Sequence, residues 1–338
     1  MPRLTSDKAV GVRYVLRKLG FYAVAAWLAI TLNFLLPRLI PGDPVEQLMA
    51  RMSQAGSVAP GEADTLRQLL GLGHGNGIQQ YLGYLHQLVT LRFGMSITYF
   101  PLPVTTIIGQ EIYWTVILVG VALVLSVGLG LALGAVAGWR RGSRWDLTVP
   151  LGMLFSAMPY FWVALLLLYV FAHRLRLFPL SGGYDPALIP GWHAAFVATA
   201  VRHAILPALT IVISSVGTWM FGMRNMMVST LSEDYVVAAQ AKGLRPRTVM
   251  WGYAARNAVI PSVSGFAISL GFVVSGALAM EIVFSYPGIG YNLLAAVQND
   301  DYPLMQGIFL VITLAVLAAN LVVDLLHGFL DPRTRASR

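Results

Sequence analysis

Long stretches without charged residues dominate the sequence. Six stretches between charged or histidine residues are long enough to cross the roughly 30 Å hydrocarbon core of a bilayer, which takes about 20 helical residues. They run over residues 19–37, 112–139, 147–172, 204–223, 257–280 and 302–323. The pattern predicts an all-α polytopic membrane protein with six transmembrane helices.

Two further features refine this assignment. An uncharged run over residues 282–299 is interrupted by Tyr286-Pro-Gly-Ile-Gly290. Irregular backbone is tolerated at membrane depth only against protein or water, so we expect a turn and then a short surface or re-entrant helix. The first run is too long for a signal peptide, and Arg38 and Pro41-Gly-Asp-Pro44 follow it instead of a cleavage site.

The basic residues indicate the orientation, because cytoplasmic loops are enriched in lysine and arginine. With the N-terminus in the cytoplasm, 16 of the 23 Lys and Arg residues lie on the inner side. They cluster in residues 3–18, 140–144, 224–256 and 333–338. A seven-span arrangement would export the last cluster, so we predict six spans with both termini cytoplasmic.

Composition supports a membrane protein: 57% of the 338 residues are hydrophobic and 11% are charged, against about 25% charged in soluble domains. The net charge of +8 would suit nucleic-acid binding only on a soluble surface, and here uncharged runs separate the charges. The absence of cysteine excludes disulfides, thiolate metal sites and cysteine nucleophiles. We treat residues 1–338 as a single transmembrane domain.

The long outer loop, residues 38–111, contains an apolar stripe at helical spacing. The stripe comprises Tyr81, Leu82, Leu85, Leu88 and Val89. It fits a helix lying in the outer membrane interface, and equally a lid packed on the protein's own loops.

The interiors of the six spans contain no Lys, Arg, Asp, Glu or His. Buried ionisable residues are typical of ion-coupled transport, so an autonomous secondary transporter is the less favoured alternative. Glu281 and Asp324 lie at span edges. For Glu281 a local structural contact is favoured over a gate or loop anchor, and for Asp324 a pairing with an inner arginine or a helix cap.

Small residues and one proline predict how the spans pack. Gly130, Gly134 and Gly138 form two GxxxG steps, and residues 265–276 give the fifth span a second small-residue surface. Close packing within the chain is favoured over a dimer seam or a hydrated pathway. Pro159 should kink the third span.

Enzyme motifs do not occur in the sequence. There is no GxxxxGK[ST], HExxH or GxSxG motif, and all six histidines lie outside the span interiors. We therefore expect no catalytic residues and no metal or cofactor site in this chain.

The most informative segment is the cytoplasmic loop 226–261. Thr230 to Glu233 can form a capping box, residues 235–242 continue as a short helix, and Gly243 suits the position after its C-terminus. Small alanines on this helix would let another protein approach its backbone closely. A docking helix and an ordinary surface loop both fit these residues.

Several motifs then resemble one family. Val237-Ala-Ala-Gln-Ala-Lys-Gly243 followed by Ala255-Arg-Asn-Ala-Val-Ile-Pro261 resembles the EAA loop of ABC-importer permeases. The other motifs, in order, are Leu39-Ile-Pro-Gly-Asp-Pro44, Phe93-Gly-Met-Ser96, Gly142-Ser-Arg-Trp-Asp146, Glu281-Ile-Val-Phe-Ser-Tyr-Pro-Gly-Ile-Gly290, Asp301-Tyr-Pro303, Asn320-Leu-Val-Val-Asp324 and Asp331-Pro-Arg333. The ordered set resembles the dipeptide/oligopeptide (and nickel) permeases, in particular the first, B-type permease subunit. Val237 replaces the glutamate of the general EAA pattern, and Gly252-Tyr253 stands where the peptide branch usually has Arg-His.

The resemblance implies a type I ABC-importer permease fold in the bacterial cytoplasmic membrane. Such a permease forms half of the path for peptides, with oligosaccharides or a nickel chelate as alternative cargo. It implies four kinds of partner: a second homologous permease, two cytosolic ATPase subunits that use ATP and Mg²⁺, an extracytoplasmic binding protein and the lipid bilayer. No nucleic acid is expected as a partner.

The resemblance also assigns roles to residues of this chain. It implies an ATPase-docking coupling helix that comprises Glu233, Asp234, Tyr235, Ala238, Ala239, Lys242 and Gly243. It places near the outer gate or pathway Asp43, Pro159, Glu281, Pro287 and Gly288.

Overall fold

The computed structural model describes residues 3–39, 49, 76–260, 262 and 277–330. Over these residues the regular secondary structure is helical, with turns and loops between the helices and one isolated β-bridge between Met95 and Pro103. The predicted all-α class is therefore confirmed. Contacts divide the chain into two compact units, one of residues 1–113 with 292–338 and one of residues 114–291. The single domain stays a prediction.

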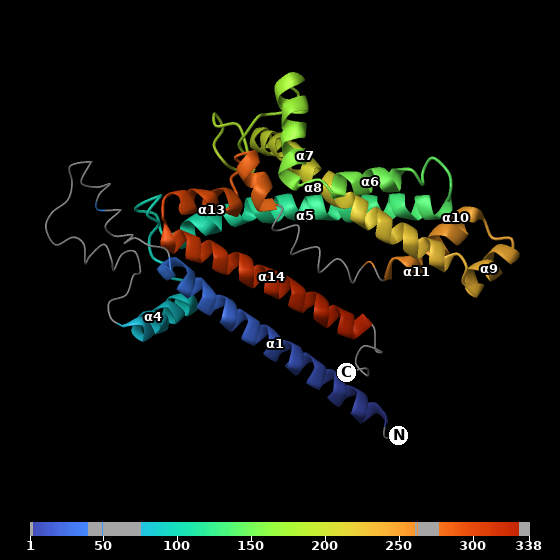
Figure 1. Cartoon of the computed structure of the whole chain (residues 1–338), viewed down its shortest axis with the longest axis horizontal. Helices are drawn as coiled ribbons and strands as arrows, with labels where there is room; N and C mark the ends of the chain where they lie inside the picture. The colour runs from blue at the N-terminus through green and yellow to red at the C-terminus, as the bar shows by residue number, and fades with distance from the viewer. Residues whose placement is uncertain (1–2, 40–48, 50–75, 261, 263–276, 331–338) are drawn as a thin grey trace. The chain divides into compact units, whose positions relative to one another are not determined.

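Figure 1 shows the helices in chain order. They are α1 (Arg3–Leu39), α4 (Gly77–Thr90), α5 (Val104–Trp139), α6 (Thr148–Ser156), α7 (Tyr160–Leu167), the π-helical η1 (Leu168–Arg174), α8 (Ala194–Thr230), α9 (Asp234–Ala241), α10 (Pro246–Thr248), the π-helical η2 (Val249–Ala255), α11 (Arg256–Ala258), α13 (Ile289–Gln298) and α14 (Tyr302–Leu330).

Four helical segments among the described residues are long and apolar enough to cross a membrane. They are Val15–Leu35 of α1, α5, α8 and Tyr302–Val322 of α14. The predicted third span is broken: α6 and the α7–η1 segment meet at 104° and count as a fifth span only if taken together. Most of the predicted span 257–280, with the small residues 265–276, lies outside the described residues, so the count of six stays a prediction.

The break in the third span falls at Pro159, which precedes α7 with an extended ψ of 139°. Proline has no N–H for a helical hydrogen bond, and its ring disfavours helical backbone in the residue before it. The kink predicted at Pro159 is thus confirmed, and it is a full change of direction between two short helices.

In the first unit, α1 and α14 pack antiparallel. Lys18 Nζ lies 2.6 Å from Asp324 Oδ2, and Asn33 Nδ2 donates to the carbonyl oxygen of Gln306 at 2.8 Å. Tyr22 also donates its hydroxyl to Asp324, at 2.9 Å. The structural role predicted for Asp324 is confirmed, with Lys18 in place of the expected arginine.

The amphipathic stripe predicted within residues 38–111 forms α4, which begins with a capping box between Asn76 and Gln79. Tyr81 Oη lies 2.8 Å from Thr31 Oγ1 of α1, and the buried Tyr84 accepts a hydrogen bond from Asn33. Leu82 and Val89 remain exposed. The helix packs on α1 through its tyrosines, and part of its apolar stripe stays uncovered within the chain.

Two of the sequence motifs meet at the start of α14. The buried Asp301 accepts hydrogen bonds from the Thr98 N–H at 2.8 Å, from the Leu304 N–H at 3.1 Å and from the Ser96 hydroxyl. Its carboxylate therefore caps the first turn of α14 and fixes the loop that precedes α5.

In the second unit, α8 packs closely against both α5 and α6. A methyl group at Gly134 would lie 2.5 Å from the carbonyl oxygen of Met220, and one at Gly138 would lie 2.6 Å from Met227 Cβ. Gly217 of α8 meets the backbone of Gly152 in α6 with the same closeness. The GxxxG surface serves packing within the chain, as predicted.

Candidate functional site

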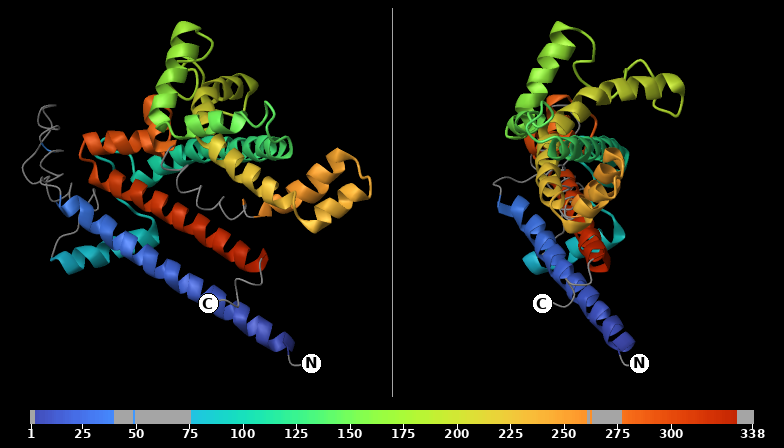
Figure 2. Two further views of the ribbon diagram at one scale, coloured as in Figure 1. Left: turned by 45° about the vertical axis from the view of Figure 1, so that its right-hand side comes forward. Right: turned by 90° about the vertical axis from the view of Figure 1, so that its right-hand side faces the viewer.

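The residues after α8 fold into a helical hairpin, defined here as residues 234–258. It contains α9, α10, η2 and α11, and it follows the end of α8 in Figures 1 and 2. Val236 and Ala239 are its buried α9 residues, with exposed fractions of 0% and 3%. They belong to an apolar cluster with Ala135, Met223, Met227, Val249, Met250, Ala254, Ala255 and Ala258. The cluster fixes the hairpin to the ends of α5 and α8 by apolar burial.

The C-terminus of α9 has the predicted glycine cap. Gly243 has a φ of +71°, a backbone conformation that glycine adopts without steric cost. Its N–H donates to the Gln240 carbonyl at 2.9 Å, and the Leu244 N–H donates to the Ala239 carbonyl at 3.4 Å. These two bonds form a Schellman motif, so the end of α9 is sharply defined.

The predicted capping box at the N-terminus of α9 is wrong. Thr230 is a buried residue in the last turn of α8, and the N-cap of α9 is Glu233, whose side chain makes no capping hydrogen bond. The box fails because α8 continues to Thr230, which leaves this side chain three residues before the N-cap. Glu233 and Asp234 still lie at the positive end of the α9 dipole.

Six of the seven predicted coupling residues are exposed. They are Glu233, Asp234, Tyr235, Ala238, Lys242 and Gly243. The seventh, Ala239, faces the apolar cluster and is a packing residue of the hairpin. The outer face of α9 combines acidic residues at its start, a half-exposed tyrosine and a small alanine before Lys242. Such a face leaves the helix backbone accessible to a groove on another protein.

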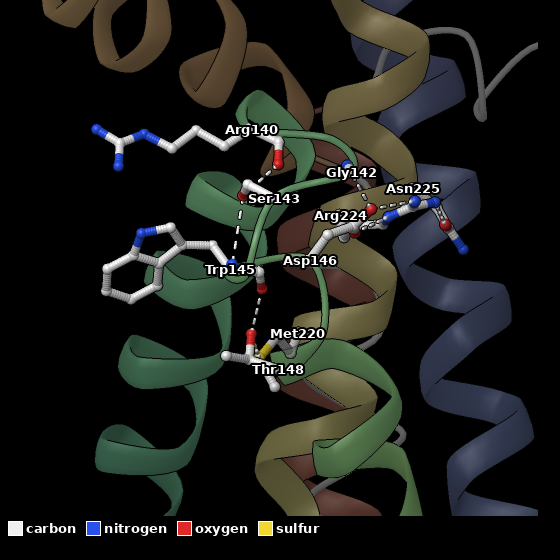
Figure 3. A network of polar contacts seen from close by, with 9 residues as sticks. All are labelled: Arg140, Gly142, Ser143, Trp145, Asp146, Thr148, Met220, Arg224 and Asn225. Atoms are coloured by element: carbon white, nitrogen blue, oxygen red, sulfur yellow. Dashed lines mark hydrogen bonds and ion pairs between the residues drawn. The ribbon is translucent and has the colours of Figure 1, made fainter.

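A bidentate ion pair connects the start of α6 to the end of α8 near the hairpin (Figure 3). Arg224 Nε donates to Asp146 Oδ1 at 3.0 Å, and Nη2 donates to Oδ2 at 3.2 Å. The Gly142 N–H also donates to Asp146, at 3.1 Å. These hydrogen bonds, the one from Arg224 foremost, hold the pKa of Asp146 below its ordinary value.

No local pattern in the sequence predicts this pair. Asp146 occurs in a family motif and Arg224 ends an uncharged run, but they are 78 positions apart. The one signal that could have indicated the pair is that Asp146 and Arg224 carry opposite charges and both flank predicted spans on the predicted cytoplasmic side. The pair matters for the site because Arg224 lies among the α8 residues that anchor the hairpin.

We predict that Asp146→Asn lowers the free energy of unfolding in detergent by up to about 1 kcal/mol at neutral pH. Because the folded-state pKa is lowered, the stabilisation is present above the ordinary carboxyl pKa of about 3.9 and is lost as pH falls through the folded-state value. Thermal unfolding of wild type and variant at a series of pH values measures the difference. Arg224→Lys keeps the positive charge but cannot donate two parallel hydrogen bonds to Asp146, so its free energy of unfolding should lie between those of wild type and Asp146→Asn. Equal stability at neutral pH would contradict the prediction.

The other candidate group surrounds the turn after residue 280. Glu281 is fully buried and accepts hydrogen bonds from Thr115 Oγ1 and from the Gly290 N–H, both at 2.6 Å. Thr115 Oγ1 in turn accepts the Ile289 N–H at 3.0 Å. A side chain at Gly288 would overlap the Glu281 carboxylate. Glu281 thus makes the structural contact that was favoured, and the same hydrogen bonds anchor the turn that follows it.

The connection between η1 and α8 packs on the same turn. The Gly182 N–H donates to the Phe284 carbonyl at 2.9 Å, and a methyl group at Gly183 would lie 2.5 Å from Pro287. The structure thus brings Glu281, Pro287 and Gly288 together, while Pro159 lies at the α6–α7 break. Asp43 lies outside the described residues. A gate or pathway role for these residues stays a prediction.

We predict that Glu281→Ala lowers the free energy of unfolding by about 2–4 kcal/mol, because it leaves the buried Gly290 N–H and Thr115 hydroxyl without their acceptor. Glu281→Gln should cost much less, since its amide oxygen can accept from Gly290 and its NH₂ can donate to Thr115. Thermal unfolding of the purified chain in detergent compares the two variants. An alanine variant as stable as the glutamine variant would contradict the assigned hydrogen bonds.

The fold and the hairpin define a class: a polytopic helical membrane protein with a small capped helix exposed beside the end of a spanning helix. Comparison with known families is consistent with this class. The family described as "Binding-protein-dependent transport system inner membrane component" matches residues 130–336, and the chain belongs to that family.

Two relatives that match nearly the whole chain are named as permeases of transport systems. The chain is 35% identical to the di/tripeptide transport system permease protein of Pseudomonas aeruginosa, over 96% of this chain and 99% of that one. It is 32% identical to the dipeptide transport system permease protein of Escherichia coli, with the same coverage. The resemblance inferred from the sequence motifs is therefore confirmed.

Proposed function

We propose that this chain is a permease subunit of an ATP-driven ABC importer and forms half of the translocation path for di- and oligopeptides. The observation that carries the proposal is the near full-length similarity to two permeases named for di/tripeptide and dipeptide transport. An importer of oligosaccharides or of a nickel chelate is the alternative, and the names of these two relatives favour peptides.

In this proposal the exposed face of α9 docks on a cytosolic ATPase subunit. The Schellman cap at Gly243 and the apolar cluster around Val236 and Ala239 support a rigid hairpin. Displacement of α9 by the ATPase then reaches α8 through Met223 and Met227, which belong to the same cluster. The Asp146–Arg224 pair passes this displacement to the α5–α6 turn.

The membrane arrangement completes the proposal. The chain crosses the cytoplasmic membrane six times with both termini inside. The antiparallel packing of α1 and α14 supports placing both termini on one side of the membrane, because Lys18 near the start of the Val15–Leu35 segment contacts Asp324 near the end of α14. The turn around Glu281, Pro287 and Gly288 then lies at the outer side as part of the gate or pathway. We propose a gate or pathway role for Asp43 and Pro159 as well.

The partners follow from the same proposal. A second homologous permease supplies the other half of the path, and an extracytoplasmic binding protein delivers the peptide. Two ATPase subunits bind and hydrolyse ATP with Mg²⁺, so this chain carries no catalytic role and binds no cofactor itself.

The test is purification of the assembled complex through a tag on this chain, followed by mass spectrometry of its subunits. Reconstitution into liposomes then measures peptide uptake with and without ATP. We expect two ATPase subunits, a second permease and uptake that needs ATP and the binding protein. A complex without a nucleotide-hydrolysing subunit, or uptake by this chain alone, would contradict the proposal.

A further inference from the structure

A pocket of about 450 Å³ lies at the turn between α5 and α6, and the proposed transport mechanism assigns no ligand to it. Its lining combines the charged side chains of Arg144, Asp146 and Arg224 with apolar side chains that include Leu147 and Phe221. A pocket with both kinds of lining suits a ligand that is itself charged at one end and apolar at the other.

The charges in this pocket favour an anion. Arg224 and Asp146 neutralise each other through their bidentate pair. Arg144 is exposed, and none of the residues that the structure describes forms an ion pair with it. One guanidinium is therefore left uncompensated, and its planar fork matches two oxygens of a phosphate group. Two more arginines, Arg140 and Arg141, precede it in the same turn.

An apolar track leads from the pocket along α6. Leu147, Leu151 and Leu154 are 57–63% exposed. Because they are four and three residues apart, they lie on one face of the helix. Free phosphate would gain nothing from this track, whereas an acyl chain would bury it. The ligand that uses both features is amphipathic.

The side chains around the turn suit a membrane interface. Figure 3 shows that Arg140 and Trp145 point to one side of the turn, away from the Asp146–Arg224 pair. Tryptophan and long basic side chains are typical of the level where lipid headgroups meet the hydrocarbon. The predicted orientation puts this level on the cytoplasmic side, where anionic lipids attract clustered basic residues.

We propose that this pocket binds an anionic phospholipid of the cytoplasmic leaflet. The phosphodiester pairs with Arg144, and one acyl chain lies along Leu147, Leu151 and Leu154. The bound lipid then holds the α5–α6 turn at the point where the Asp146–Arg224 pair connects it to α8.

The test is native mass spectrometry of the complete importer taken from nanodiscs of phosphatidylcholine and phosphatidylglycerol in equal amounts. We expect wild type to retain phosphatidylglycerol in preference to phosphatidylcholine, and Arg144→Gln to reduce this retention about fivefold, the usual effect of one basic residue near an anionic surface. The matched control is Arg247→Gln, which removes an exposed guanidinium from the hairpin and should retain the lipid. Leu151→Ala, which shortens the apolar track, should weaken retention.

Three results would overturn the proposal. One is equal retention of phosphatidylglycerol by wild type and Arg144→Gln. Another is wild type that retains no phosphatidylglycerol, as when a partner subunit fills the pocket. The third is displacement of the lipid by added inorganic phosphate alone, which would make the pocket a free-phosphate site.

Discussion

Gly217→Ala is expected to be among the most damaging single methyl additions in this chain. A Cβ atom at this position would overlap the carbonyl group of Gly152 and lie 2.7 Å from the Met153 nitrogen. These are backbone atoms of α6, so no side-chain rotation relieves the overlap, and α6 must move away from α8. Overpacking of this kind costs about 3 kcal/mol. In lipid, helix association depends on close van der Waals contact. When α6 moves away from α8, this contact is lost, and no hydrophobic driving force between the helices replaces it.

The measurement is the yield and thermal unfolding of the purified protein. We expect an apparent Tm lower by roughly 5 °C or more, the shift that such a cost produces in a protein of this size. The matched control is Gly222→Ala on the same helix, where a Cβ would meet nothing within 4 Å. Because alanine is the better helix former by about 1 kcal/mol, the control should be as stable as wild type or more. Equal Tm values for the two variants would contradict the α6–α8 contact.

The second large effect is expected at the surface of α9. Ala238→Trp should lower peptide transport and peptide-stimulated ATP hydrolysis about tenfold or more, a loss of at least about 1.4 kcal/mol of coupling. Ala238 is exposed, so the indole does not disturb the apolar cluster that holds the hairpin. Its bulk instead prevents a close approach of the partner to the helix backbone.

Two comparisons separate docking from folding in this experiment. Ala238→Ser keeps the small side chain and should transport normally. Membrane insertion and Tm of the isolated chain should be unchanged in both variants, because the substitution touches no buried residue. Normal peptide-stimulated hydrolysis in Ala238→Trp would show that α9 is not the docking surface.

Local sequence signals predicted the parts of the site that depend on short-range physics. Gly243 was identified as the cap of α9 because a glycine after a helical run suits the left-handed conformation found there. Pro159 was identified as a break because proline removes a helical hydrogen bond wherever it occurs. The spacing of Gly130, Gly134 and Gly138 predicted a close helix contact, and the contact lies within the chain.

Features that depend on distant segments were not predicted. The Asp146–Arg224 pair requires α5, α6 and α8 to meet, and no periodicity in one segment encodes that meeting. The burial of Ala239 likewise depends on the return of η2 beneath α9. The capping box at Thr230 failed for a related reason, since the sequence does not mark where α8 stops.

The most direct test of the account uses the absence of cysteine from this chain. A single cysteine at Ala238 can carry a photoreactive maleimide in the assembled importer, and irradiation then joins it to whatever lies against α9. We predict an adduct with an ATPase subunit from Ala238→Cys, and none from Ala239→Cys, whose side chain is buried. The claim that α9 couples this permease to its ATPase would be contradicted if no ATPase adduct formed. It would also be contradicted if a membrane-impermeant maleimide added outside intact cells labelled Ala238→Cys.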